Sequence, residues 1–131
     1  MADEEAVKKS GRLRSVGLGK NWKMALDKLC REVVFARDDG CQWCGRLDRQ
    51  MQWAHVRSRR YLSTRWDTRN SLKLCGGCHL LWHHQPLEAI DWFNFKFPAR
   101  AKALRLHNSG THKVDKTLIK LALEQELNKY R

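Results

Sequence analysis

The stretches Cys41-Gln-Trp-Cys44 and Cys75-Gly-Gly-Cys78 decide the fold of this chain. Two residues between a pair of thiolates let one tight turn present both sulfurs to a single ion, and two such turns complete a tetrahedral site. The alternatives are redox-active dithiols and unrelated buried cysteines, but two matched pairs favour the metal. We therefore predict one structural zinc ion (Zn²⁺), bound by Cys41, Cys44, Cys75 and Cys78.

The overall charge points to the class of partner. Lysine and arginine together number 26 against 14 acidic residues, which gives a net charge of +12. Such a surplus favours an anionic partner, either a nucleic acid or a phospholipid surface. No apolar run approaches the roughly 20 residues that span a bilayer, and the first residues do not resemble a signal peptide. We expect no membrane partner and a cytoplasmic chain, in which cysteines serve metal binding rather than disulfides.

Outward from the cysteine pairs, the chain divides into an arm and one domain. Residues 1–20 combine lysine and arginine with glycine, serine and little apolar content, which predicts a flexible basic N-terminal arm. Residues 21–131 are expected to form a single domain. Its first element, about 21–38, has apolar residues at helical spacing and stops before Asp39-Gly40. Cys30 lies on the apolar face of this helix, which predicts an inert core thiol.

The remainder of the domain is predicted as a zinc core followed by helices. The core, about 39–85, is rich in turn residues and should contain a β-hairpin around Met51–Val56 and a helix that begins near Cys78. The C-terminal helices occupy about 86–131. Pro86 and Pro98 suit the first turns of two of them, the second ending before Gly110, and Asp115 suits the cap of the last. The aromatic residues predicted to pack in the core are Trp92, Phe93, Phe95 and Phe97.

Two histidines follow the second cysteine pair at helical spacing. His79 and His83 are four residues apart, so they share one face of a helix that begins near Cys78. That face is rotated by about 100° from the face of Cys78. One helix could therefore give a sulfur to the zinc and two imidazoles to a second metal, whereas His84 turns away. The alternative is a pair of histidines on a solvated helix surface.

These motifs carry a resemblance to a known superfamily. The segments Cys41-Gln-Trp-Cys44-Gly45, Trp53-Ala54-His55-Val56, Asn70 and Cys75-Gly-Gly-Cys78-His79 resemble the HNH (ββα-metal, His-Me finger) endonucleases in their zinc-knuckle variant. The string His55-Val-Arg-Ser-Arg-Arg, with Arg65-Trp-Asp67 and Asn70, is similar to phage HNH proteins, including the NinG/Rap recombination nucleases. The resemblance covers residues 37–92. It implies an α+β fold in which flanking α-helices surround a zinc-stapled ββα-metal (HNH) core.

The same resemblance implies roles for four residues. His55 is the general base that takes a proton from the attacking water, a task that suits an imidazole because its ordinary pKa lies near operating pH. His79 is a ligand of a catalytic Mg²⁺ or Mn²⁺, and His83 is its second ligand. Asn70 either fixes the loop that carries His55 or itself touches the metal. The alternatives are a structural role for His55 and ordinary turn chemistry for Asn70.

One position departs from the pattern of the superfamily. Many HNH proteins have an aspartate or histidine ligand immediately before the general base, where this chain has Ala54. The metal then rests on fewer protein ligands and more water, which Mg²⁺ tolerates. Asp67 could substitute, although a salt bridge between Asp67 and a neighbouring arginine is an equal expectation.

Basic residues gather around this motif. Residues 49–83 hold seven basic residues and one acidic residue, a net charge of +6 that is half the total. A solvated charged surface would mix signs, so a phosphate-binding surface is predicted, with Arg59 and Arg60 as the main clamps. The predicted DNA-binding residues are Arg57, Arg59, Arg60, Arg65 and Arg69.

The sequence thus predicts a metal-dependent DNA endonuclease that hydrolyses phosphodiester bonds, and the resemblance implies phage DNA recombination or processing as its setting. The main alternative is a zinc-stapled DNA-binding module without catalysis, which Ala54 favours and the pair His79 and His83 disfavours. A zinc module for protein interaction is disfavoured by the clustered arginines. The shape of the DNA substrate, the sequence preference, the oligomeric state and the physiological metal are left open.

Overall fold

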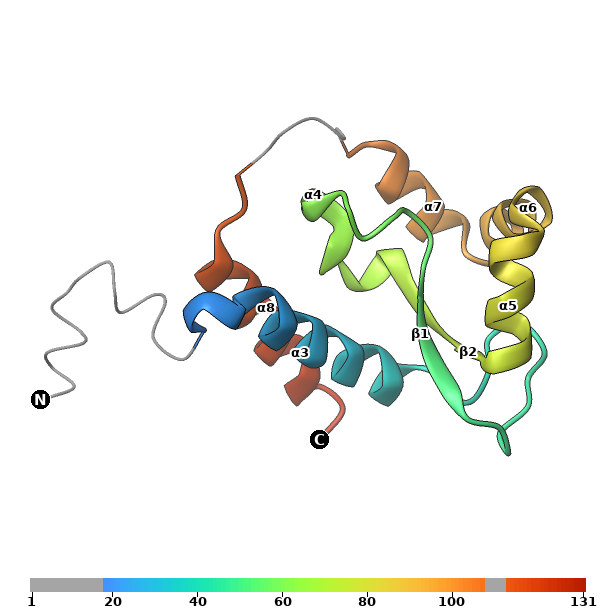
Figure 1. The fold of residues 1–131 in the computed structure, drawn as a ribbon, viewed down its shortest axis with the longest axis horizontal. Coiled ribbons are helices and arrows are strands. Elements are labelled where there is room, and N and C mark those ends of the chain that lie inside the picture. The colour runs from blue at the N-terminus through green and yellow to red at the C-terminus, as the bar shows by residue number, and fades with distance from the viewer. Residues whose placement is uncertain (1–17, 108–112) are drawn as a thin grey trace, which may run out of the picture.

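A computed structural model describes residues 18–107 and 113–131 and has the predicted α+β class, with helices around a two-stranded antiparallel sheet (Figure 1). The strands are β1 (Met51–His55) and β2 (Ser71–Cys75). The helices are α3 (Trp22–Arg37), α4 (Leu62–Arg65), α5 (Gly76–His84), α6 (Pro86–Lys96), α7 (Pro98–Arg105) and α8 (Lys116–Asn128), with 3-10 turns η1 (Gly19–Asn21) and η2 (Thr68–Asn70).

Helix boundaries follow the local signals in the sequence. α6 and α7 begin at Pro86 and Pro98, where the missing N–H of proline costs no helical hydrogen bond. The Asp115 carboxylate caps α8, because it accepts hydrogen bonds from the backbone N–H groups of Thr117 (3.0 Å) and Leu118 (3.2 Å). These three starts agree with the predictions. Gly110, the predicted limit of the preceding helix, lies outside the described residues.

The strand pairing differs from the predicted local hairpin. β1 pairs with β2, with Met51 opposite Cys75 and His55 opposite Ser71, so the 15 residues 56–70 connect the two strands. This connection contains α4 and η2 rather than a tight turn. The antiparallel register brings Cys75, at the end of β2, to the start of β1 and close to the loop that carries the first cysteine pair.

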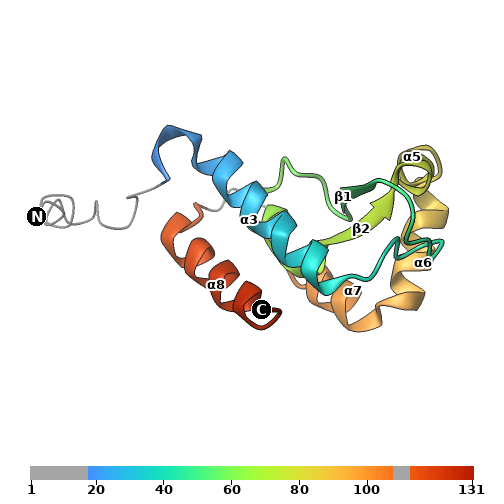
Figure 2. The same ribbon diagram turned by 90° about the horizontal axis from the view of Figure 1, so that it is seen from below.

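Helices cover the sheet from two sides, as the two views show (Figures 1 and 2). α3 and α8 lie side by side and share a core whose buried residues include Leu26, Val33 and Leu123. The second core joins the sheet to α5, α6 and α7. Its buried side chains include Leu72, Leu74, Trp82, Phe93 and Leu104. Burying one large apolar side chain contributes about 1.5–3 kcal/mol to the stability of the fold. The buried side chains of these two cores therefore hold the sheet between the helices.

Cys30 and three of the four aromatic residues that were predicted for the core pack there. Cys30 is fully buried, which confirms a core thiol, and burial raises the pKa of this thiol to about 12. Phe93 is fully buried, and Trp92 and Phe97 pack against the same core. Phe95, however, is 85% exposed, so the prediction is wrong for this residue. Two positions correspond to about 200° around a helix, which turns Phe95 away from the face of Phe93.

The predicted N-terminal arm falls largely outside the described residues, which begin at Leu18. Leu18 itself is buried against the core of α3 and α8, and η1 follows directly. None of the helices in the described parts of the chain is long and apolar enough to cross a bilayer.

Candidate functional site

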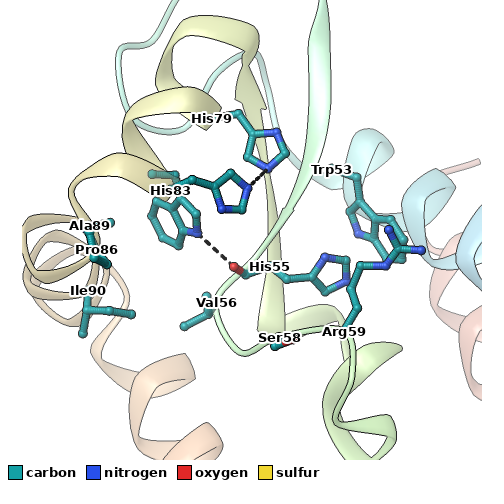
Figure 3. Close-up of a pocket in the computed structure, with 11 residues that line it drawn as sticks. Trp53, His55, Val56, Ser58, Arg59, His79, His83, Pro86, Ala89 and Ile90 are labelled. Atoms are coloured by element: carbon teal, nitrogen blue, oxygen red, sulfur yellow. Dashed lines mark hydrogen bonds between the residues drawn. The ribbon is translucent and has the colours of Figure 1, made fainter.

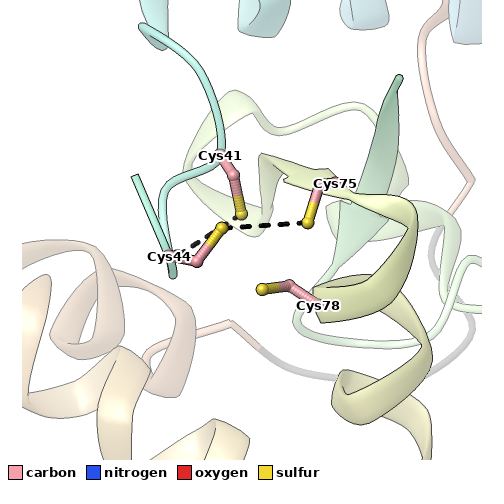
Figure 4. A group of neighbouring side chains, drawn as sticks. All are labelled: Cys41, Cys44, Cys75 and Cys78. Atoms are coloured by element: carbon pink, nitrogen blue, oxygen red, sulfur yellow. Dashed lines mark hydrogen bonds between the residues drawn. The ribbon is translucent and has the colours of Figure 1, made fainter. Parts of the chain in front are cut away.

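The four predicted zinc ligands converge (Figure 4). Cys41 and Cys44 lie in the turn after α3, Cys75 ends β2, and Cys78 lies in the first turn of α5. The four sulfurs lie within 4.8 Å of one another, and those of Cys44 and Cys75 are 3.9 Å apart. Zinc–sulfur bonds of about 2.3 Å in a tetrahedron place sulfurs about 3.8 Å apart, so the cluster fits one zinc ion.

The backbone of the first turn supports metal binding. The Cys44 N–H points to the Cys41 sulfur at 3.5 Å. Burial opposes ionisation of Cys41, but hydrogen bonds from backbone N–H groups, that of Cys44 first, outweigh it and lower the pKa to about 7. Gly40 permits the turn: it has a φ of 69°, and an added Cβ would lie 2.6 Å from the carbonyl oxygen of Arg46. A thiolate available near neutral pH is the form that binds zinc.

His79 and His83 lie on α5 and line a cavity together with residues of β1 (Figure 3). The Nε2 atoms of His79 and His83 are 3.2 Å apart. Two nitrogens bound to one ion at about 2.0–2.2 Å lie about 2.8–3.6 Å apart for bond angles between about 90° and 110°, so this pair fits two neighbouring ligands of one ion. Burial and the neighbouring His83 lower the pKa of His79, which favours the neutral form that binds metals.

His55 ends β1, and its half-buried imidazole extends toward Trp53 and Arg59 (Figure 3). Its Nε2–H donates to the carbonyl of Arg65 at 3.3 Å, which leaves Nδ1 to accept a proton. Burial, aided by the positive charges of Arg59 and Arg65, lowers the pKa of His55 to about 4. This pKa lies below the ordinary imidazole pKa on which the prediction of His55 as a general base relied. The imidazole therefore stays neutral in mild acid.

We expect this shift to make stability depend on pH through His55. The folded pKa of about 4 lies below the ordinary 6.5, so the unfolded chain binds the proton first and the free energy of unfolding falls between pH 6.5 and 4. The loss should be on the order of 1–2 kcal/mol from pH 7 to pH 5. Urea unfolding of the wild type and His55→Gln at both pH values isolates this effect, because the cysteines titrate alike in both proteins. Equal losses in the two proteins would contradict it.

Asn70 is fully buried, and its side-chain amide is occupied by the connection between the strands. Its Oδ1 accepts from the N–H of Arg57 at 2.8 Å. Its Nδ2 donates to the carbonyls of Arg57 and Thr64 at 3.1 and 3.0 Å. The three backbone partners hold Asn70 within the connection that follows β1, and a buried amide with these partners has no room for a metal.

A cavity of about 540 Å³ joins the histidines. His55, His79 and His83 line it together with Arg59, and Pro86 and Ile90 form its apolar wall (Figure 3). The Trp82 N–H donates to the His55 carbonyl at 2.9 Å and thereby ties α5 to β1. Within the described residues, no hydrogen bond or ring contact links His55 to His79 or His83. The three therefore share a cavity without touching across it.

The five predicted DNA-binding arginines differ in how free they are. Arg57 and Arg60 both lie over the ring of Tyr61, with their guanidinium carbons 5.3 and 5.6 Å from its centre. Arg59 lines the cavity and is 54% exposed, although it pairs with Asp27 at 2.8 Å. Arg65 is only 16% exposed and binds both carboxylate oxygens of Asp27. Its guanidinium therefore holds the loop against α3 and offers little charge to a ligand.

Arg69 and Asp67 form the salt bridge that was one of the two expectations for Asp67. Their side chains are 2.8 Å apart, and the carboxylate also accepts from the Arg69 N–H. Asp67 lies in the cavity between α4 and α8 and does not line the cavity of the three histidines. Ala54 is fully buried in the core. Among the described residues, no carboxylate lines the cavity of the three histidines.

Sequence reasoning missed two residues that organise the site. Asp27 on α3 binds Arg59, Arg65 and the Trp66 N–H. Gln52 on β1 contacts the His79 ring. The apolar spacing of α3 marks Asp27 only as a polar residue between core positions, and the alternation in β1 places Gln52 on the same face as Ala54. Neither pattern indicates which residue Asp27 or Gln52 contacts.

Comparison of the chain with models of protein families, with curated proteins and with solved structures finds no match.

Proposed function

We propose that this chain is a metal-dependent DNA endonuclease of the HNH type. The observation that carries the proposal is the convergence of the His79 and His83 Nε2 atoms, 3.2 Å apart, in a cavity that also contains His55 and Arg59. The order of two antiparallel strands and a helix, with a four-cysteine cluster at one end, supports a zinc-stapled ββα-metal core. The net charge of +12 supports a nucleic-acid substrate.

In this proposal the residues of the chain divide the work of phosphodiester hydrolysis. Nδ1 of His55 takes a proton from a water molecule, whose oxygen forms a bond to phosphorus as the bond from phosphorus to the 3′ oxygen breaks. The leaving 3′ oxygen takes a proton from solvent. Arg59 binds the phosphate, and Asn70 holds the loop that orients both groups. A Mg²⁺ or Mn²⁺ ion held by His79 and His83 would supply positive charge to the phosphate and the leaving oxygen.

A zinc-stapled DNA-binding module without catalysis is the second candidate. Two observations favour this candidate. The chain has a buried alanine, Ala54, at the position where many HNH proteins have an aspartate or histidine ligand, and the lowered pKa of His55 makes its imidazole a weaker base. The two candidates differ in one outcome, cleavage. Phage DNA recombination or processing is the setting that we propose for the enzyme.

Cleavage by the purified wild type tests the proposal. Linear, nicked and four-way DNA substrates are incubated with Mg²⁺, Mn²⁺ or no added metal, and the products are resolved on denaturing gels. We expect metal-dependent cuts in at least one substrate. Binding of all three without any cut under any ion would establish the module without catalysis instead.

DNA affinity is expected to depend steeply on salt and on Arg59. Each phosphate that a cation neutralises releases counterions, so the slope of log affinity against log salt should become shallower by about one in Arg59→Gln. Arg46→Gln is the matched control, because Arg46 is equally exposed at 51%, also pairs with an aspartate, and lies away from the cavity. Titrations of labelled DNA at several salt concentrations measure both slopes. A flat response in the wild type, or equal changes in the two variants, would contradict a phosphate site at Arg59.

A further inference from the structure

Gln52 is an unassigned residue beside the candidate metal site. It lies on β1, opposite Leu74 of β2, and its side chain reaches the first turn of α5. Its Oε1 is 2.6 Å from Nδ1 of His79, a short hydrogen bond between two side chains 27 positions apart. Its Nε2 lies toward Gly76, 3.5 Å from the position of an added Cβ there. The amide therefore presents its oxygen to His79.

An amide oxygen can only accept a hydrogen bond, so the contact requires the proton of neutral His79 on Nδ1. The lone pair then lies on Nε2, the nitrogen that faces Nε2 of His83 at 3.2 Å. Histidine ligands of metals typically donate their other N–H to an acceptor in this way, which fixes both the tautomer and the orientation of the ring. Oε1 is at Nδ1 and not at Nε2, so Gln52 acts on the metal through His79 and is not a ligand.

We propose that Gln52 is the positioning residue of the metal site, because it locks His79 in the tautomer that presents Nε2 to a divalent ion. The inference rests on the proposed metal site at His79 and His83. It gives β1 a role in metal binding although Ala54 cannot bind a metal. The strand contributes Gln52, a hydrogen-bond acceptor that orients the metal ligand His79. The sheet and α5 must then pack correctly before the site can bind metal.

The tautomer of His79 can be read directly in the zinc-loaded protein. Long-range ¹H–¹⁵N NMR at pH 8, assigned with His79→Ala, distinguishes a proton on Nδ1 from one on Nε2. We expect the Nδ1–H form in the wild type and its loss in Gln52→Ala. Mn²⁺ affinity, measured by calorimetry, should fall about 10–100-fold in Gln52→Ala, the usual cost of losing such a partner. Gln52→Glu keeps an acceptor and should restore both the tautomer and the affinity.

Gln50→Ala is the matched control, because Gln50 is also exposed and immediately precedes β1. It should change neither readout, and zinc content verifies that each variant is folded. A proton on Nε2 of His79 in a wild type that binds Mn²⁺ overturns the inference alone. A Gln52→Ala protein in which either the His79 tautomer or the Mn²⁺ affinity is unchanged also overturns the inference. A wild type that binds no divalent ion at His79 and His83 overturns the proposed function, and the inference with it.

Discussion

Replacement of Cys75 with serine is expected to abolish zinc binding and to unfold the region around the sheet. Cys75 is buried at the end of β2, and its sulfur belongs to the cluster that joins β2, α5 and the loop after α3. Structural zinc contributes roughly 10–16 kcal/mol in small zinc domains, compared with a net stability of about 5–15 kcal/mol for a typical protein. Elemental analysis and circular dichroism should show no zinc and a loss of folded structure.

Cys30→Ala is the matched control for this experiment. Cys30 is as buried as Cys75 but lies in the core of α3 and α8, outside the cluster. Its removal should cost about 1 kcal/mol and leave one zinc per chain. A Cys75→Ser protein that keeps its zinc and its fold would contradict the assignment of the ligands. Free titration of the four clustered thiols in the native wild type would contradict it as well.

Cleavage is expected to fall about 10²–10⁴-fold in His55→Ala, the usual cost of losing a general base. Zinc content and DNA affinity should stay close to those of the wild type, because His55 is outside the cysteine cluster and its neutral ring contributes no charge to phosphate binding. Single-turnover cleavage at saturating protein separates the chemical step from binding. An unchanged rate would remove His55 from the mechanism.

His79→Ala is expected to be as damaging by a different route. It removes one of the two nitrogens that converge at 3.2 Å, so metal affinity falls and excess Mg²⁺ or Mn²⁺ should restore part of the activity. The same excess should not restore His55→Ala. His84→Ala is the control, since His84 lies on the same helix but does not line the cavity. Rescue of both variants, or of neither, would contradict this division of roles.

Local chemistry in the sequence was enough to predict several elements. Prolines at 86 and 98 and the carboxylate of Asp115 mark helix starts because each acts on backbone groups within its own first turn. The spacing of the cysteine pairs predicts a joint cluster, because one turn presents both sulfurs of a pair and a tetrahedral ion needs the sulfurs of two such pairs. The spacing of His79 and His83 likewise predicts their contact, because four residues return to the same face of a helix.

The tertiary structure decided what depends on packing between distant segments. β1 pairs with a strand beyond residue 70 and not with a local partner, since the connection is held by the buried amide of Asn70 rather than by a tight turn. Burial lowers the pKa of His55, and Asp27 on a different helix takes up the charge of Arg65.

The sequence alone therefore predicted the cysteine cluster and the pair of histidines, because the spacing within each pair follows from the regular geometry of a turn or a helix. The α+β class was predicted from the resemblance to HNH proteins. Only the packing of β1 against α5 placed Gln52 at His79, and only the packing of α3 against the connection between the strands placed Asp27 at Arg59 and Arg65. These outcomes depend on which residues meet across an interface, and the periodicity of a single segment does not contain that information.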